Sequence, residues 1–370
     1  MSKNWIPPIS PLIGSSISNF FKALKSRRID NKHYVKVLLS SIVSGITTLF
    51  MLWEKLRENK DHSLHSPPIF IIGHWRSGTT YLHNLLCQDP NAGYITTYQS
   101  LFPNNLYSKG IFKTILKLVI PGKRPSDNVK LDVDFPQEDE FALENLLAPS
   151  FYNFFFFPEN YDQLFDETIL FKNKSESEIQ KWAIVYKELI AKGQNNTKGK
   201  YMVLKNPVNT GRVDKILSMY PHARFIHIYR NPVIVYLSTK KFFLALIPEL
   251  QLQHSTQEQI IDLIFDLYDR LMHAYFEKRE SIPSSQLLEI DFETFESKPL
   301  ENLKKIYSSL TIPNWDQSLP HFEKYLKHLG DYKKNNYKIT SIELDRIKEE
   351  WGFAFKHFGY NIPIDIDVID

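Results

Sequence analysis

The stretch Pro67–Asn84, PPIFIIGHWRSGTTYLHN, decides the fold of this chain. An apolar run, Ile69–Ile72, stops at Gly73, and a second glycine, Gly78, is followed by two threonines and an apolar helical pattern. A buried strand, a glycine-bounded turn and a helix N-terminus in this order can hold an anion, because backbone N–H groups point inward and the helix dipole favours negative charge. The stretch therefore predicts a strand–loop–helix unit that binds a phosphate-like group.

The spacing from Gly73 to Gly78 is that of a nucleotide phosphate loop, G-x-x-x-x-G. A triphosphate loop continues with Lys and then Ser or Thr, which serve the β- and γ-phosphates and Mg²⁺. Here Thr79 stands in the place of that Lys, and the nearby cation is Arg76, inside the loop. Such a loop is poorly suited to ATP hydrolysis and better suited to a smaller anion, such as a 5′-phosphosulfate.

The segment His74–Thr80, HWRSGTT, resembles the 5′-phosphosulfate loop of the PAPS-dependent sulfotransferases, in the bacterial and Golgi-type branch whose loop carries Arg. PAPS is 3′-phosphoadenylyl sulfate, the sulfuryl donor. The resemblance implies that Arg76 stabilises charge on the bridging oxygen of the donor. It also implies that the donor's 5′ end is bound by Arg76, Ser77, Gly78, Thr79 and Thr80. The alternative is an ordinary turn between a strand and a helix.

A second segment, residues 223–238, reads ARFIHIYRNPVIVYLS and supports the first. It predicts a buried strand that ends at Arg230, and Ser238 follows eight residues later in the next helix. Sulfotransferases bind the 3′-phosphate of PAPS with an Arg and a Ser in this arrangement, so the resemblance assigns that role to Arg230 and Ser238. Arg suits it because its planar fork donates two hydrogen bonds to one phosphate. His227 alternates with apolar residues and is expected in the core.

Lys205-Asn206-Pro207 resembles the family's K-S-P element, which makes Lys205 the second cation at the reacting centre. Asn replaces Ser there, so a hydroxyl contact at this position is in doubt. Residues 288–310 resemble the family's segment that begins Y-E-D-L. The likeness extends over residues 67–358.

Alternating strands and helices predict a P-loop-type α/β fold, with a parallel sheet flanked by helices on both faces. The expected strands are residues 69–72, a short one near 94–97, 201–204, 225–229 and a further buried strand at 286–291. The expected helices are 176–193, 210–219, 256–280, 301–310 and 341–358. Residues 1–66 are expected to form a peripheral amphipathic helical segment and 67–370 the sulfotransferase domain. Within it, 101–175 would be a helical or irregular insertion on the acceptor side.

A general base must accept the proton of the acceptor hydroxyl. Residues 134–140, DFPQEDE, resemble a P-Q-E-D-E element of the bacterial branch, and within them Glu138 is the preferred base and Glu140 the second. The alternative is a solvated acidic turn that caps the next helix. His74, beside the loop Arg, is a rival base or a sulfate ligand.

Composition limits the function further. Lys and Arg number 45 against 42 Asp and Glu, a net charge of +3, which gives no reason to expect a nucleic-acid partner. The single cysteine, Cys87, suits a reducing compartment and a core position. No His/Cys cluster has metal-ligand spacing, so no metal is expected. Because the first ten residues show no apolar signal region, a cytoplasmic protein is expected.

Residues 37–53 lack charge and place apolar side chains at helical spacing. The preferred interpretation is an amphipathic helix packed on the domain through this apolar face. A helix that lies on a membrane, with contact through residues 35–57, is one alternative, and a spanning helix is another. The sequence leaves the oligomeric state open.

The acceptor is the least determined part. The aromatic run Phe151–Pro158, FYNFFFFP, indicates an apolar pocket and hence an alcohol on a sterol- or lipid-like small molecule, although the run could instead be core. Carbohydrate and phenolic or tyrosyl hydroxyls are the alternative acceptors. A P-loop kinase or NTPase, and a membrane-associated nucleotide-binding protein without catalysis, are the alternative functions.

Overall fold

The computed structural model describes residues 11–54, 63–119, 132–329, 338–363 and 366–369. The chain divides into two compact units, each built from several segments. The first contains residues 1–64, 94–198 and 244–256, and the second contains 65–93, 199–243 and 257–370. The domain limits expected from the sequence, 1–66, 67–370 and the insertion 101–175, stay predictions.

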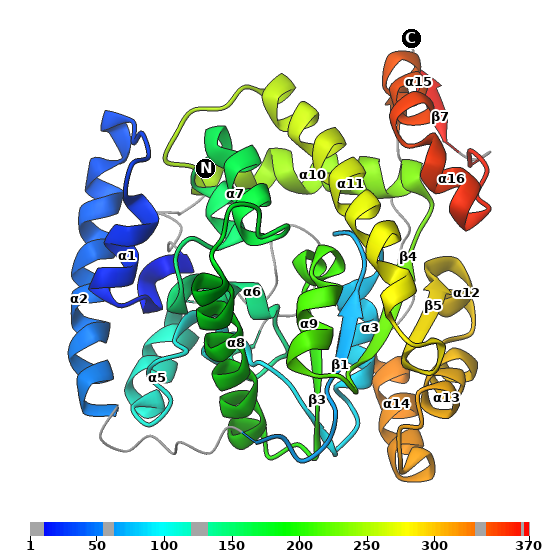
Figure 1. The fold of residues 1–370 in the computed structure, drawn as a ribbon, viewed down its shortest axis with the longest axis horizontal. Coiled ribbons are helices and arrows are strands. Elements are labelled where there is room, and N and C mark those ends of the chain that lie inside the picture. The colour runs from blue at the N-terminus through cyan, green and yellow to red at the C-terminus, as the bar shows by residue number, and fades with distance from the viewer. Residues whose placement is uncertain (1–10, 55–62, 120–131, 330–337, 364–365, 370) are drawn as a thin grey trace. The chain divides into compact units, whose positions relative to one another are not determined.

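The second unit contains a five-stranded sheet in which all neighbouring strands are parallel. Its strands are β1 (Ile69–Ile72), β2 (Ala92–Gly93), β3 (Tyr201–Lys205), β4 (Arg224–Tyr229) and β5 (Leu287–Asp291), in the order β2-β3-β1-β4-β5. All four residues of β1 are fully buried, as expected for a central strand between β3 and β4. The predicted α/β fold with a parallel sheet is confirmed (Figure 1).

The strand order explains why helices flank both faces of the sheet. Helix α3 (Thr79–Leu86) connects β1 to β2, toward one edge of the sheet. Helix α9 (Val213–Met219) connects β3 to β4, past β1 and toward the opposite edge. Right-handed crossovers in opposite directions place their helices on opposite faces. Helix α11 (Gln257–Lys278) packs on α9, and α14 (Trp315–Leu329) packs on α3.

Two sequence expectations in this unit need correction. The strand expected to be buried at 286–291 is β5, at the edge of the sheet, where only Ile290 is buried. The single helix expected at 341–358 is two helices, α15 (Ser341–Glu350) and α16 (Gly352–Phe358). They are separated at Trp351, whose buried indole donates to the Phe265 carbonyl and stacks on Tyr268 at 4.0 Å. The remaining helices and strands that include residues of this unit are η5 (Pro207–Gly211), α10 (Pro232–Leu250), η6 (Arg279–Ser281), η7 (Ser284–Gln286), α12 (Phe292–Ser297), α13 (Pro299–Ser309), β6 (Lys338–Thr340) and β7 (Asp367–Ile369).

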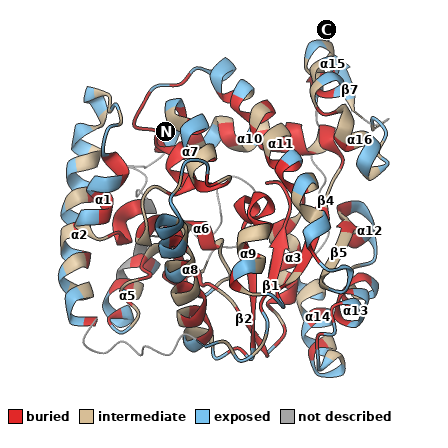
Figure 2. Ribbon diagram, in the orientation of Figure 1, coloured by how far each residue is buried: buried red, intermediate tan, exposed pale blue. Residues whose placement is uncertain are grey.

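The first unit is helical over most of its described residues. Its elements are η1 (Pro11–Gly14), α1 (Ile17–Leu24), η2 (Asn31–His33), α2 (Tyr34–Glu54), α4 (Thr97–Leu101), α5 (Lys109–Val119), α6 (Asp139–Leu146), η3 (Phe151–Phe155), η4 (Pro158–Asn160), α7 (Tyr161–Thr168) and α8 (Glu176–Thr197). The strand expected near 94–97 is wrong, because β2 lies at Ala92–Gly93 and α4 begins at Thr97. Figure 2 shows that the central strands β1, β3 and β4 are largely buried and that much of α2 is exposed.

The aromatic run at 151–158 forms the core of the first unit. Phe154 and Phe155 contact each other at a ring-centroid distance of 4.1 Å, and every aromatic residue from 151 to 157 is buried. Its use as the wall of an acceptor pocket is therefore wrong: the rings cover one another instead of lining an accessible surface.

Helix α2 has the reverse of the expected orientation. Ser40, Ser44 and Thr47 are buried, whereas the large apolar side chains at Leu38 and Ile42 are 59% and 52% exposed. The expectation that the apolar face packs on the domain is therefore wrong, because the polar face makes that contact. Within the described chain, Asn31–Glu54 is one helical segment long and apolar enough to cross a membrane, by length and composition only.

Candidate nucleotide-binding site

The loop 73–80 joins β1 to α3, and its first glycine is required by a close approach of two backbones. Gly73 has a φ of 137°, and a Cβ there would lie 2.2 Å from the carbonyl oxygen of Ile228 on β4. The Gly73 N–H donates to the Thr210 hydroxyl over 2.8 Å. Thr210 is 137 residues away in sequence, so no local signal could have revealed this contact.

The second glycine precedes the helix. Gly78 has a φ of 95°, in the left-handed region that favours glycine, and a Cβ there would lie 2.1 Å from the ring of Phe292. Helix α3 begins at Thr79, and the first N–H groups of a helix have no partner within it. The loop therefore offers backbone donors and the positive end of a helix dipole.

Arg76 lies within the loop and contacts Ser238 directly. Its Nε donates to the Ser238 hydroxyl over 2.8 Å, and its guanidinium lies 5.6 Å from the ring centre of Phe242. Ser238 and Phe242 both belong to α10. Arg76, predicted for the 5′ end of the donor, and Ser238, predicted for its 3′-phosphate, are thus in contact.

Arg230 follows the last residue of β4, as predicted. Its guanidinium stacks on Phe292 at 4.3 Å from the ring centre, and its Nε is 3.8 Å from a carboxylate oxygen of Glu293. The next residue, Asn231, accepts a hydrogen bond from the Val233 N–H and fixes the start of α10. Sequence reasoning missed Phe292, which contacts both the Gly78 position and Arg230.

Lys205 ends β3, next to β1 in the sheet, and is almost completely buried. Its Nζ donates to the Thr80 hydroxyl over 3.3 Å. Asn206, which replaces the expected Ser, accepts from the Val208 N–H over 3.1 Å and caps η5. The replacement thus has a structural explanation.

Among the described residues of this unit, three histidines are buried. Burial lowers the pKa of His74 to about 4 and that of His83 to about 3, so both rings are neutral at pH 7. His74 Nδ1 is 2.8 Å from the Trp75 carbonyl, and its Nε2 is buried with no hydrogen-bond partner among the described residues. His227 is fully buried, which confirms its predicted place in the core.

Glu138 and Glu140 belong to the first unit, at the start of α6. Glu138 accepts a hydrogen bond from the Tyr152 hydroxyl, and Glu140 accepts one from the Ser150 hydroxyl over 2.8 Å. Glu140 is 1% exposed, so the alternative of a solvated acidic turn is wrong for it. The assignment of the general base stays a prediction. Among the described residues, no group of three or more His, Cys, Asp or Glu could hold a metal ion.

The structure brings together, within the second unit and around the carboxyl end of β1, all the residues predicted to bind the donor. These are Arg76, Ser77, Gly78, Thr79, Thr80, Arg230 and Ser238, with Lys205 beside them. Three cations beside a helix N-terminus suit a ligand that carries more than one anionic group.

The whole chain can also be compared with known proteins. Residues 67–317 match the model of the Sulfotransferase family, and the chain belongs to that family of enzymes. The chain is 29% identical over 364 residues to the omega-hydroxy-beta-dihydromenaquinone-9 sulfotransferases Stf3 of Mycobacterium bovis and Mycobacterium tuberculosis, covering 97% of this chain and 93% of theirs.

Two solved structures have the same fold. The sulfotransferase STF9 from Mycobacterium avium superposes with a TM-score of 0.66 at 16% identity, over 95% of this chain and 98% of that one. STF1 from Mycobacterium tuberculosis gives a TM-score of 0.63 at 17% identity, over 92% and 94%.

Proposed function

We propose that this sulfotransferase transfers a sulfuryl group from PAPS to a hydroxyl of a lipid-like small molecule, giving a sulfate ester and adenosine 3′,5′-bisphosphate. The observation that carries the proposal is the contact network in which Arg76 meets Ser238 and Arg230 meets Phe292, which itself lies against Gly78. One network thus joins the residues proposed for the 5′ and 3′ ends of the donor.

The residues present suit this donor. PAPS carries a phosphosulfate and a separate 3′-phosphate, and the network offers Arg76 and Lys205 near the loop and Arg230 at the end of β4. Lys205 is 1% exposed, and a buried ammonium group is stable only with polar or anionic partners. Its hydrogen bond to the Thr80 hydroxyl would place it close to an anion held by the loop.

The chain's own residues then supply position and charge. The bond from sulfur to the phosphate oxygen breaks as the acceptor oxygen bonds to sulfur, and the hydroxyl proton goes to a base. Arg76, with Lys205 second, would stabilise the charge that grows on the leaving oxygen, and the α3 N-terminus with Thr79 and Thr80 would hold the 5′-phosphate. Arg230 and Ser238 would hold the 3′-phosphate.

Glu138 remains the preferred base, with Glu140 second. His74 is weaker in both of its proposed roles. A pKa of about 4 makes its ring a poor proton acceptor at neutral pH and leaves it without charge for a sulfate.

The lipid-like acceptor rests on the relatives named for omega-hydroxy-beta-dihydromenaquinone-9, because the aromatic run at 151–157 is core. A hydroxylated menaquinone is the first acceptor to test and a sterol the second. A cytoplasmic enzyme with peripheral membrane contact through residues 35–57 fits such an acceptor; of these residues, the structure describes those up to Glu54.

An acceptor screen with labelled PAPS tests the proposal. We expect transfer to a hydroxylated menaquinone or a sterol, and a loss of at least about a hundredfold in Arg76→Ala. Lys298→Ala is the matched control, since Lys298 is exposed in the same unit and pairs with Glu301. Transfer only to carbohydrate or tyrosyl hydroxyls would refute the acceptor class, and turnover of Mg·ATP without any sulfuryl transfer would refute the reaction.

A further inference from the structure

The apolar face of α2 is the largest feature of the first unit that the proposed reaction does not use. Ten large apolar side chains of this one helix are exposed. They are Tyr34, Val35, Leu38, Leu39, Ile42, Val43, Ile46, Leu49, Leu52 and Trp53. Their spacing of three and four residues places them along one side of a helix about 30 Å long. A continuous apolar surface of this kind marks an interaction site.

The opposite side of α2 is polar and bound to the protein. Thr47 donates to the Ser15 carbonyl over 3.1 Å, and Thr48 accepts from the Ile17 N–H over 2.8 Å. At the C-terminal end, Glu54 accepts from the Ser108 N–H over 2.8 Å. These bonds fix which side of the helix faces outward, so the apolar surface is held in place by the fold.

The same bonds argue against a helix that crosses a bilayer. A spanning helix is surrounded by lipid, and its polar side chains would lose these backbone partners within the hydrocarbon. A helix with one bound polar side and one exposed apolar side can instead lie in the plane of a membrane surface.

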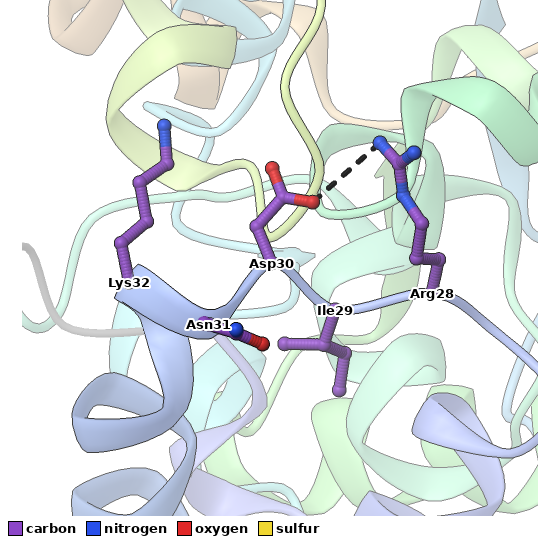
Figure 3. Close-up of a pocket in the computed structure, with 5 residues that line it drawn as sticks. All are labelled: Arg28, Ile29, Asp30, Asn31 and Lys32. Atoms are coloured by element: carbon purple, nitrogen blue, oxygen red, sulfur yellow. Dashed lines mark ion pairs between the residues drawn. The ribbon is translucent and has the colours of Figure 1, made fainter.

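Positive charge surrounds the N-terminal end of this surface. Residues 22–36 contain six Lys or Arg and one Asp, and Lys22, Lys25 and Lys32 are exposed. Figure 3 shows an open depression at the start of α2, where Arg28, Asp30 and Lys32 extend to the same side of the chain. Arg28 is paired with Glu159 at 2.5 Å and lies 3.5 Å from Asp30, so the positive charge offered to a partner comes mainly from the exposed Lys22, Lys25 and Lys32. Basic side chains beside an apolar face complement anionic lipid headgroups.

Aromatic residues lie at both ends of the surface. Tyr34 is 56% exposed at the start of α2 and Trp53 is 42% exposed near its end. Tyr and Trp favour the boundary between hydrocarbon and headgroups, because each combines an apolar ring with a polar group.

We propose that α2 lies in the plane of an anionic phospholipid membrane, with Ile42 and Ile46 toward the acyl chains and the basic residues at the headgroups. The choice of lipid over a second copy of the chain rests in part on the proposed lipid-like acceptor. Such an acceptor resides in the membrane, so a surface helix would hold the enzyme where its substrate is.

Vesicle flotation with the full chain tests this without donor or acceptor, so its failure is distinct from failure of the proposed reaction. The vesicles are phosphatidylcholine alone or phosphatidylcholine mixed with phosphatidylglycerol. We expect binding to the mixed vesicles, reduced by about 0.5 M salt. The double variant Ile42→Glu/Ile46→Glu should bind at least about tenfold more weakly. Changing Lys22, Lys25 and Lys32 to Gln should weaken binding about fivefold for each residue, and only on the vesicles that contain phosphatidylglycerol.

The matched control is Ile184→Glu/Ile342→Glu, which replaces two exposed isoleucines outside α2. It should bind as the wild type does, and circular dichroism melts should show that all variants fold. Equal loss in the control, or no binding by the folded wild type, would overturn the proposal. A solution mass of twice 43.5 kDa for the wild type, which falls to half in Ile42→Glu/Ile46→Glu, would also overturn the proposal, because a second copy of the chain would then cover the apolar face. Vesicle-bound protein that resists alkaline extraction would overturn it in favour of a spanning helix.

Discussion

Replacing Gly78 with alanine tests whether the loop geometry depends on Phe292. The new Cβ would lie 2.1 Å from the Phe292 ring, where carbon atoms normally stay about 3.5 Å or more apart, so the ring must move by more than about 1 Å. The φ of 95° adds strain for any residue with a Cβ. Backbone strain of about 1–2 kcal/mol and overpacking of about 1–3 kcal/mol predict a total loss of about 2–5 kcal/mol.

A double-mutant cycle separates the two contributions. In a Phe292→Ala background the overpacking disappears, so Gly78→Ala should cost only the backbone strain, a difference of about 1–3 kcal/mol. Because Arg230 stacks on Phe292, a displaced ring should also weaken binding of adenosine 3′,5′-bisphosphate in the single Gly78→Ala variant.

Urea unfolding followed by circular dichroism gives the stabilities, and calorimetric titration gives the affinities. The control is Gly45→Ala, because a Cβ there meets nothing within 4 Å inside α2 and should stabilise the chain by about 0.5–1 kcal/mol. If Gly78→Ala costs the same with and without the Phe292 ring, the packing argument is wrong.

Two further predictions concern single side chains. Ser238→Ala removes the hydroxyl that accepts the hydrogen bond from Arg76 Nε. We expect bisphosphate binding, measured by titration, and kcat, measured in single-turnover assays, each to fall by about tenfold or more. Unchanged values would show that this contact is incidental. Burial raises the pKa of Glu144 to about 8, above the value of about 4.5 expected in the unfolded chain, so its carboxyl is protonated in the fold at neutral pH. As pH rises from about 4.5 to 8 the unfolded chain ionises this carboxyl while the fold keeps it protonated, and the folded state loses stability relative to the unfolded one. Glu144→Gln should therefore remove up to about 1.4 kcal/mol of destabilisation per pH unit in that range. The melting temperature of the variant should exceed that of the wild type by more at pH 8 than at pH 5. The opposite trend would mean that Glu144 is ionised in the fold.

The strand–loop–helix unit at 69–86 was predictable because its signals are local. Apolar residues, two glycines and a helix start follow one another within one short stretch, and parallel strands bring their carboxyl ends together. Arg230 and Lys205 were predictable for the same reason, since each stands at the end of an apolar run.

Contacts between distant residues were not predictable. Nothing near Gly73 in sequence indicates that Thr210 accepts its N–H, and nothing near Gly78 indicates Phe292. Periodicity in α2 identified an apolar face but could not say whether that face or the polar one meets the protein. The answer depends on backbone groups such as the Ser15 carbonyl, which only the fold presents.

Composition also misled at the aromatic run. Phenylalanines such as Phe154 and Phe155 favour burial, but a sequence does not show whether a ligand or the protein itself covers them. The proposed lipid-like acceptor therefore does not rest on this run.

The central claim is that the loop 73–80 and Arg230 together bind a nucleotide with a 3′-phosphate. Calorimetric titration of the wild type and Arg230→Ala with adenosine 3′,5′-bisphosphate and with 5′-AMP tests it most directly. The wild type should bind the bisphosphate about 10- to 100-fold more tightly than 5′-AMP, since each hydrogen bond from a charged donor contributes about 1.5–3 kcal/mol. In Arg230→Ala the two affinities should become similar. Equal affinities in the wild type would contradict the claim.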